Sequence, residues 1–129
     1  MDCLFCKIIN GDIPSKTIYE DEDFKVFLDI NPSTNGDMLI VPKKHFENIY
    51  DIDEKLIPRI HELIKKLFDL AKDKLGAEGL TIVQNNGHGQ EIKHYHVHVT
   101  PRYSNDNIKT IKNENILVSI DDVYEQIKN

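Results

Sequence analysis

Residues 94–100 alternate strictly between polar and apolar side chains, and this alternation constrains the fold more than any other feature of the chain. Histidine occupies positions 94, 96 and 98, and Tyr95, Val97 and Val99 lie between them. Because successive side chains of a β-strand point to opposite faces, the three imidazoles share one face and the apolar side chains share the other. The segment therefore predicts a half-buried strand that carries three histidines on one face.

Short apolar runs bounded by turn residues predict further strands. Together with the histidine strand, the predicted set spans residues 17–20, 24–30, 38–41, 80–83 and 95–100. These strands follow one another without a βαβ rhythm and accompany a single long helix. This order indicates an α+β fold with a mainly antiparallel sheet of about five strands.

Apolar residues at helical spacing predict the long helix within residues 49–75. Asp53 is its predicted N-cap, Pro58 is placed in its first turns, and Gly76 is its predicted C-cap. Shorter helices are predicted over residues 3–10 and 121–128, while residues 116–120 fit either a strand or a loop. The predicted apolar face of the long helix consists of Leu56, Ile60, Leu63, Ile64, Leu67, Ala71 and Leu75.

The length and composition fit one domain spanning residues 1–129. Hydrophobic residues make up 40% of the chain and charged residues 29%, without an apolar run long enough to span a bilayer. The N-terminus carries no secretory signal, so we expect a cytoplasmic protein whose two cysteines stay reduced. The net charge of −6 argues against general nucleic-acid binding, but it allows a small phosphorylated ligand at a local site.

The spacing of the three histidines argues against one metal ion shared by all of them. A strand rises roughly 3.3 Å per residue, so His94 and His98 are about 13 Å apart along the backbone. We therefore expect the histidines to divide their roles, and a catalytic metal held by all three is the disfavoured alternative. The polar, glycine-bearing loop 84–90 before this strand can offer backbone N–H groups to phosphate oxygens, although such loops are most often plain turns.

The alternating histidines and several other segments resemble the histidine-triad (HIT) family of nucleotide-binding proteins. The resemblance covers residues 3–102, is closest to the bacterial Hint-like branch with a Cys-x-x-Cys zinc site, and leaves residues 103–129 as a tail. It implies a HIT-like α+β fold with short terminal helices, and a homodimer whose sheets join edge to edge. In the family's order, the matching segments are Phe5-Cys6-Lys7-Ile8-Ile9, Ile13-Pro14-Ser15, Phe27-Leu28-Asp29-Ile30-Asn31-Pro32, Ile40-Val41-Pro42-Lys43-Lys44-His45, Gln84-Asn85-Asn86-Gly87, Gly89-Gln90 and the histidine strand with Pro101-Arg102.

The resemblance implies a nucleotide site centred on His96. His96 matches the nucleophile, which attacks phosphorus and becomes transiently nucleotidylated, and His98 matches a catalytic residue that holds a phosphate oxygen. Asn85 and Gln90 match positions that contact phosphate, and Asp29 matches the carboxylate that accepts from the ribose hydroxyls. By pattern alone, the residues of the implied purine pocket are ordinary core positions: Phe5, Ile8, Ile13, Phe27 and Ile30.

The closely spaced thiols of Cys3 and Cys6 suggest a metal site. In a reducing compartment, a Cys-x-x-Cys pair with two histidines is a typical structural zinc set. The pattern alone also fits a redox pair or two buried cysteines. The resemblance implies that His45 and His94 complete the set and that the zinc is structural, which leaves the other two strand histidines for phosphate.

The function implied by the resemblance is hydrolysis of a nucleoside 5′-phosphoramidate, or a related nucleotidyl bond, by a purine nucleotide-binding enzyme. The alternatives are a dinucleoside polyphosphate hydrolase and a nucleotide-binding interaction module with incidental catalysis. A nucleotidyl transferase is disfavoured, because such enzymes tend to carry glutamine where this chain has His98. Neither nucleic acid nor a membrane is an expected partner.

Three departures from the family pattern fall on the leaving-group side of the implied site. Lys93 stands where the family usually has an aromatic or apolar residue. Glu91 stands where some members have a hydroxyl residue that helps to protonate the leaving group, and the loop 87–90 is shorter than in many members. The other two histidines, His61 in the long helix and His88 in the loop, are expected to be solvated or packing residues.

Overall fold

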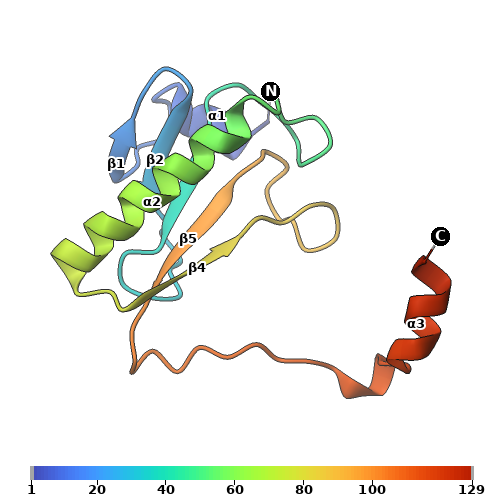
Figure 1. Ribbon diagram of the computed structural model, residues 1–129. Helices are drawn as coiled ribbons and strands as arrows, with labels where there is room; N and C mark the ends of the chain where they lie inside the picture. The colour runs from blue at the N-terminus through green and yellow to red at the C-terminus, as the bar shows by residue number, and fades with distance from the viewer. Residues whose placement is uncertain (1, 129) are drawn as a thin grey trace.

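The computed structural model describes residues 2–128, which form a five-stranded sheet with a long helix on one face and a short helix on the other (Figure 1). The strand order is β1-β2-β3-β5-β4, and every neighbouring pair is antiparallel, which confirms the predicted α+β architecture. The elements are α1 (Leu4–Ile9), β1 (Thr17–Glu20), β2 (Phe24–Leu28), β3 (Met38–Pro42), α2 (Leu56–Leu75), β4 (Gly79–Val83), β5 (Val97–Arg102), the 3-10 turn η1 (Glu114–Ile116) and α3 (Ile120–Ile127).

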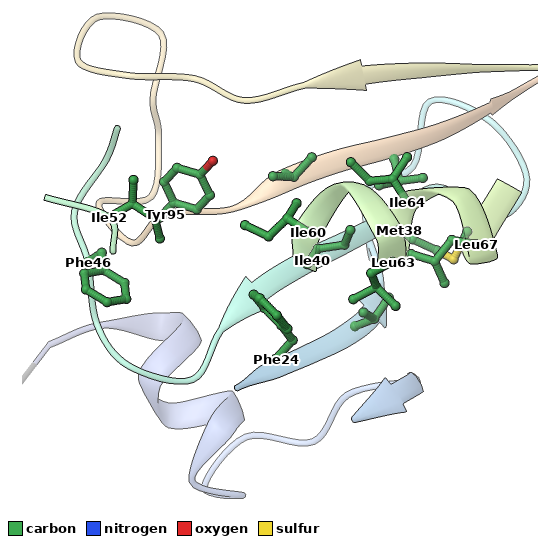
Figure 2. Close-up of a cluster of buried hydrophobic side chains, with 13 residues drawn as sticks. Phe24, Met38, Ile40, Phe46, Ile52, Ile60, Leu63, Ile64, Leu67 and Tyr95 are labelled. Carbon is green, nitrogen blue, oxygen red and sulfur yellow. The ribbon is translucent and has the colours of Figure 1, made fainter. Parts of the chain in front are cut away.

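The long helix α2 covers one face of the sheet with the apolar stripe that its sequence predicts. Its buried side chains pack against strand residues from β2, β3 and β5, and against Tyr95 just before β5 (Figure 2). Burying one such aliphatic side chain contributes about 1.5–3 kcal/mol, so the stripe holds α2 in place. The buried helix residues are Ile60, Leu63, Ile64, Leu67 and Ala71, whereas Leu75 at the helix end is half exposed.

Strand β3 is buried on both faces and joins the two halves of the core. Met38 and Ile40 belong to the cluster under α2, whereas Leu39 and Val41 belong to a second cluster on the opposite face. That second cluster also contains Phe5 and other residues of α1. The N-terminal helix is therefore packed on the face of the sheet that carries the histidines.

Two boundaries of α2 were predicted, and one of them was wrong. The helix begins at Leu56, and the N-cap position is taken by Lys55, which makes no side-chain capping bond. Asp53 instead closes the turn before the helix: its Oδ1 accepts from the Lys55 N–H at 3.0 Å and its carbonyl oxygen from the Leu56 N–H at 2.9 Å. At the other end Gly76 is the C-cap as predicted, with a left-handed φ of 70° that favours glycine.

Two strands are shorter or shifted relative to the prediction. Strand β2 ends at Leu28, because Oδ1 of Asp29 accepts from the Asn31 N–H at 2.9 Å and turns the chain. Strand β5 begins at Val97 rather than Tyr95. In the antiparallel pair of β3 and β5, Ile40 lies opposite Val97. The same register would place Pro42 opposite Tyr95, and Pro42 has no N–H with which to extend the pairing.

Beyond β5 the chain leaves the sheet and extends away from it, with α3 standing apart from the rest of the fold (Figure 1). Residues 109–128 are exposed, and α3 agrees with the helix predicted over residues 121–128. The strand alternative for residues 116–120 was wrong, because this segment joins η1 to Ser119, whose hydroxyl accepts from the Asp122 N–H and caps α3. Between residues 2 and 128, no helix combines the length and apolar character needed to cross a membrane.

Candidate active site and metal centre

A cavity of about 600 Å³ opens on the face of the sheet that carries the histidines. His96, His98, Asp29 and Asn85 all line this cavity, as their predicted roles require. All five residues of the predicted purine pocket also line it: Phe5, Ile8, Ile13, Phe27 and Ile30. Four of these are buried or half-buried side chains, whereas Ile30 is 97% exposed and stands at the rim.

The imidazole of His96 is held in one orientation by the backbone. Its Nδ1 atom lies 2.7 Å from the main-chain oxygen of His94. Because a carbonyl oxygen only accepts, Nδ1 carries the proton and Nε2 keeps its lone pair. Nε2 has no hydrogen-bond partner among residues 2–128. Within these residues every fully buried side-chain nitrogen or oxygen has a partner, so Nε2 is not fully buried and is accessible from the cavity.

The surroundings of His96 favour its neutral form. The side chain is only 6% exposed, and this burial lowers the pKa of the imidazole. The bond to the carbonyl of His94 and the charge of Asp29 act in the opposite direction, while His98 lowers the pKa further. A neutral ring with a free Nε2 is the form that can attack an electrophile.

His98 lies beside His96 in the cavity, and Asp29 lies beside His98. The ring centroids of His96 and His98 are 5.0 Å apart, and Nδ1 of His98 is 4.0 Å from Oδ2 of Asp29. Asp29 uses its other oxygen to accept from the Asn31 N–H, which fixes the carboxylate at the end of β2. A ligand that reaches His96 therefore also meets the imidazole of His98 and the carboxylate of Asp29.

The segment 84–92 borders the cavity through Asn85, Gly89, Glu91 and Ile92. Gly87 and Gly89 have φ values of 73° and 93°, which side chains rarely adopt, so the loop turns tightly at both glycines. His88 between them is exposed and does not line the cavity, and His61 is exposed on α2.

Gln90 is the one predicted phosphate-contacting residue that does not line the cavity. Its Nε2 donates to the main-chain oxygens of Glu47 at 2.7 Å and Ile92 at 3.0 Å, and its Oε1 accepts from the Gly87 N–H. The amide is thus engaged in holding the loop against the 44–48 segment. A phosphate contact by Gln90 stays a prediction.

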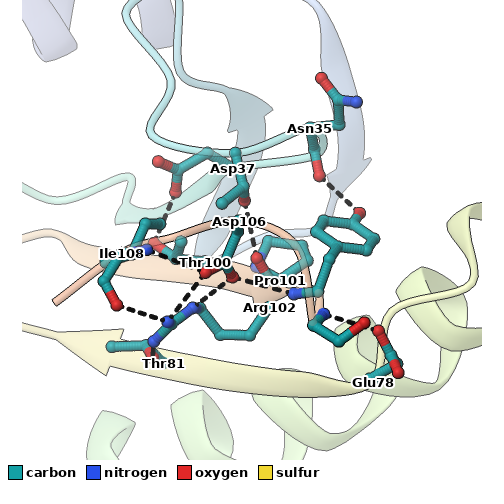
Figure 3. Close-up of polar contacts among 12 residues, drawn as sticks. Asn35, Asp37, Glu78, Thr81, Thr100, Pro101, Arg102, Asp106 and Ile108 are labelled. Atoms are coloured by element: carbon teal, nitrogen blue, oxygen red, sulfur yellow. Dashed lines mark hydrogen bonds and ion pairs between the residues drawn. The ribbon is translucent and has the colours of Figure 1, made fainter.

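Sequence reasoning missed several polar residues that line the cavity, among them Asp37 and Thr100. The buried carboxylate of Asp37 accepts from the Thr100 hydroxyl at 2.8 Å (Figure 3). It also accepts from the Ser33 N–H at 2.9 Å. Its carbonyl oxygen accepts from the N–H of Asp29. Thr100 could have been found, since it follows His98 by two positions on the same strand face, but Asp37 carried no signal.

The four predicted metal ligands meet in a partly buried corner formed by the start of α1, the segment after β3 and the segment before β5. Their ligand atoms all lie within 4.8 Å of one another. Nδ1 of His94 is 3.3 Å from Sγ of Cys3, 3.6 Å from Sγ of Cys6 and 3.1 Å from Nδ1 of His45. Tetrahedral zinc, with bonds of about 2.0–2.3 Å, places such atoms roughly 3.3–3.8 Å apart, so the cluster fits this ion.

The second nitrogen of His94 supports the same geometry. Nε2 of His94 lies 2.8 Å from the carbonyl oxygen of Pro42, so Nε2 donates and the lone pair of Nδ1 faces the two sulfurs. Burial, aided by the neighbouring Cys3, raises the pKa of the Cys6 thiol to about 11. A cation at this corner would favour the thiolate, which is the form that binds metal.

Comparison with known proteins gives consistent matches over most of the chain. A family model described as the HIT domain matches residues 10–105. An uncharacterized HIT-like protein of Methanocaldococcus jannaschii is 44% identical over 128 residues, which cover 98% of each protein. An adenosine 5′-monophosphoramidase of Schizosaccharomyces pombe is 35% identical over 104 residues, covering 79% of this chain and 75% of that protein. An adenylylsulfatase of Arabidopsis thaliana is 33% identical over 107 residues, covering 81% of this chain and 54% of that protein.

Solved structures match the same fold. A HIT family protein of Bacillus subtilis superposes with a TM-score of 0.82 at 36% identity, covering 98% of this chain and 92% of that one. A zinc-bound histidine triad protein of Mycobacterium smegmatis superposes with a TM-score of 0.80 at 34% identity, covering 88% and 84%. A bound zinc ion in a similar structure agrees with the cysteine and histidine cluster described above.

Proposed function

The chain belongs to the HIT family, and from this premise we propose that it hydrolyses nucleoside 5′-phosphoramidates or related nucleotidyl bonds through a nucleotidyl-histidine intermediate. The observation that carries the proposal is the hydrogen bond from Nδ1 of His96 to the carbonyl of His94, which leaves Nε2 free toward the cavity. Relatives named as an adenosine monophosphoramidase and an adenylylsulfatase support nucleotidyl hydrolysis in general.

The first step is attack on phosphorus by His96. The lone pair of Nε2 forms the new N–P bond, and the bond from phosphorus to the leaving nitrogen breaks. The leaving nitrogen takes a proton from solvent and departs as an amine. The phosphorylated ring carries a positive charge, which the hydrogen bond from Nδ1–H to the His94 carbonyl stabilises.

The second step returns the enzyme to its starting state. Water adds its oxygen to phosphorus and loses a proton to solvent, the N–P bond breaks, and its electron pair returns to Nε2. Two easier displacements thereby replace one difficult one. Positioned donors stabilise the charge that develops on the phosphoryl oxygens, and we assign this role to His98, Asn85 and the backbone N–H groups of segment 84–90, with Gln90 as a further candidate.

Nucleoside recognition is assigned to Asp29 and to the apolar lining of the cavity. Asp29 accepts from the ribose hydroxyls, since its Oδ2 is bound only loosely, at 4.0 Å from His98. The purine packs among the apolar lining residues. This set is Phe5, Ile8, Ile13, Phe27 and Ile30.

We assign a structural zinc ion to the cluster of Cys3, Cys6, His45 and His94. When bound, it would fasten the N-terminus and the end of β3 to the segment that leads into β5. All four positions are filled by protein ligands, which is typical of structural zinc rather than catalytic zinc. A reducing compartment such as the cytoplasm keeps both thiols available.

A homodimer is proposed together with the activity, in a chain that acts as one domain. Strand β4 is a free edge of the sheet in this chain, and Ile82 and Val83 on it are nearly half exposed. An uncovered strand edge can pair with an identical edge. Analytical ultracentrifugation tests this point: a single monomeric species at micromolar concentration contradicts the dimer.

Turnover of two substrates tests the proposed activity. Adenosine 5′-phosphoramidate and a dinucleoside polyphosphate are incubated separately with the protein, and AMP release is measured. We expect fast release from the phosphoramidate that His96→Ala abolishes, while His61→Ala, an exposed histidine outside the cavity, leaves it intact. Cleavage of the dinucleotide alone would reassign the substrate, and AMP binding without turnover of either would indicate an interaction module.

A further inference from the structure

The charges around the cavity are unevenly distributed. Three carboxylates line it, from Asp29, Asp37 and Glu91, and within residues 2–128 neither lysine nor arginine lines it. A substrate phosphate therefore enters a cavity with an excess of negative groups.

Two of these carboxylates are engaged by the protein. Asp37 is buried and accepts from Thr100 and Ser33, and Asp29 accepts from Asn31 and lies beside His98. Glu91 differs from both, because it is exposed and has no hydrogen bond or ion pair within residues 2–128. Its charge is available to a ligand.

Glu91 and Asp29, the residue assigned to the ribose, reach the cavity from opposite sides of His96. Asp29 follows β2, whereas Glu91 belongs to the segment that joins β4 to β5. In the sheet order, β2 and β4 lie on either side of the β3–β5 pair. A nucleotide whose ribose lies at Asp29 and whose phosphorus lies at His96 directs its leaving group toward the segment that carries Glu91.

We infer that the preferred leaving group is an amine that bears a second, positively charged group, and that Glu91 attracts this charge. The inference rests on the proposed function and specifies its substrate class. An exposed pair of opposite charges changes an equilibrium by about twofold to fivefold. By the same argument, leaving groups that carry phosphate are repelled, which disfavours dinucleoside polyphosphates.

Two matched substrates test the inference. They are the amidates of AMP with n-butylamine and with one nitrogen of 1,3-diaminopropane, which have the same number of non-hydrogen atoms but differ by one positive charge. The second charge also makes the departing nitrogen a better leaving group. The quantity to compare is therefore the ratio of kcat/KM for the two substrates, measured in wild type and in variants.

The ratio is kcat/KM for the cationic amidate divided by kcat/KM for the neutral amidate. Glu91→Gln should lower this ratio by about twofold to fivefold. The control is Glu62→Gln, which removes the same charge from the exposed side of α2 and should leave the ratio unchanged. Added salt should weaken the wild-type preference, because the charges are exposed. Equal ratios in wild type and Glu91→Gln would overturn the inference.

Failure of the proposed function gives a different result. In that case neither amidate is turned over by wild type. Dissociation constants for the two amidates, measured by titration calorimetry, then decide the inference by the same comparison. If Glu91→Gln lowers the preference for binding the cationic amidate over the neutral one, the inference is supported. If Glu91→Gln leaves this preference unchanged, the inference is overturned.

Discussion

The Nδ1 atom of His96 lies 2.7 Å from the main-chain oxygen of His94, whose own ring contributes Nδ1 to the metal cluster. His94 therefore belongs to both centres: its side chain faces the cysteines and its carbonyl fixes the proton of the nucleophile. The position of that carbonyl depends on where the ring of His94 is held. A metal ion bound at this cluster would thus be connected through one residue to the orientation of the proposed nucleophile.

Loss of the metal should destabilise the folded chain. Cys6→Ser removes one ligand of four, and we expect zinc content to fall well below one ion per chain. The thermal midpoint should fall by about 5 °C or more, since 1 kcal/mol shifts the midpoint of a domain of this size by several degrees. Elemental analysis and calorimetry measure both quantities. His61→Ala is the control, and a Cys6→Ser variant with full zinc content would contradict the assigned cluster.

Asp37 should position the nucleoside end of the cavity. Asp37→Ala removes the acceptor for Thr100 and Ser33 and should cost about 1–3 kcal/mol of stability. Asp37→Ala keeps the main-chain oxygen that accepts from the Asp29 N–H, but loss of the carboxylate contacts loosens the 33–37 segment that holds it, so KM for the nucleotide substrate should rise more than kcat falls. Asp37→Asn keeps one acceptor oxygen and should recover part of both effects. Equal losses in kcat for the two variants, with KM unchanged, would argue against a positioning role.

The core under α2 should respond to the removal of volume. Ile40 is fully buried between the sheet and α2, so Ile40→Ala should lower the free energy of unfolding by about 2–5 kcal/mol. Ile111 is 93% exposed, and Ile111→Ala serves as the matched control with little expected effect. Urea denaturation measures both, and similar values for the two variants would contradict the packing described here.

Asp106 should make stability depend on pH. The hydrogen bonds from Arg102 hold the pKa of the Asp106 carboxyl well below its usual range. Because this pKa is lower in the folded chain than in the unfolded chain, the stabilisation is present above the unfolded pKa and is lost as the pH falls toward the folded pKa.

Asp106→Asn should therefore lower the thermal midpoint at neutral pH, and the difference from wild type should shrink as the pH falls below about 4. Melting curves across this range provide the measurement. Asp69→Asn, an exposed carboxylate on α2, should change the midpoint little at any pH. A wild-type advantage over Asp106→Asn that stays constant down to low pH would contradict the role of this ion pair.

Much of the fold follows from local patterns. The alternation around the histidines and the stripe of α2 predicted which faces would be buried, because both depend only on the spacing of apolar residues. The start of β5 could not be predicted locally, since it depends on Pro42, which lies on another strand. Asp53 was misjudged because its side chain serves the turn before the helix.

The candidate site, like the fold, could be predicted from the sequence only in part. His96 and His98 could be placed on one face from their spacing alone, and the structure brings both to the cavity. Asp37 could not be foreseen, because its partners Ser33 and Thr100 meet it only through the folding of the chain. Gln90 matches a phosphate-contacting position in the sequence, but its amide is bonded within the loop and the backbone nearby.

The central claim is that Nε2 of His96 forms a covalent bond to phosphorus during turnover. Its most direct test is rapid acid-free quenching of the reaction with adenosine 5′-phosphoramidate, followed by mass spectrometry of the intact chain and its peptides. We expect a transient adenylyl adduct on His96 that forms and decays at rates matching turnover and is absent in His96→Ala. Full turnover without any adduct, or with an adduct on another residue, would contradict it.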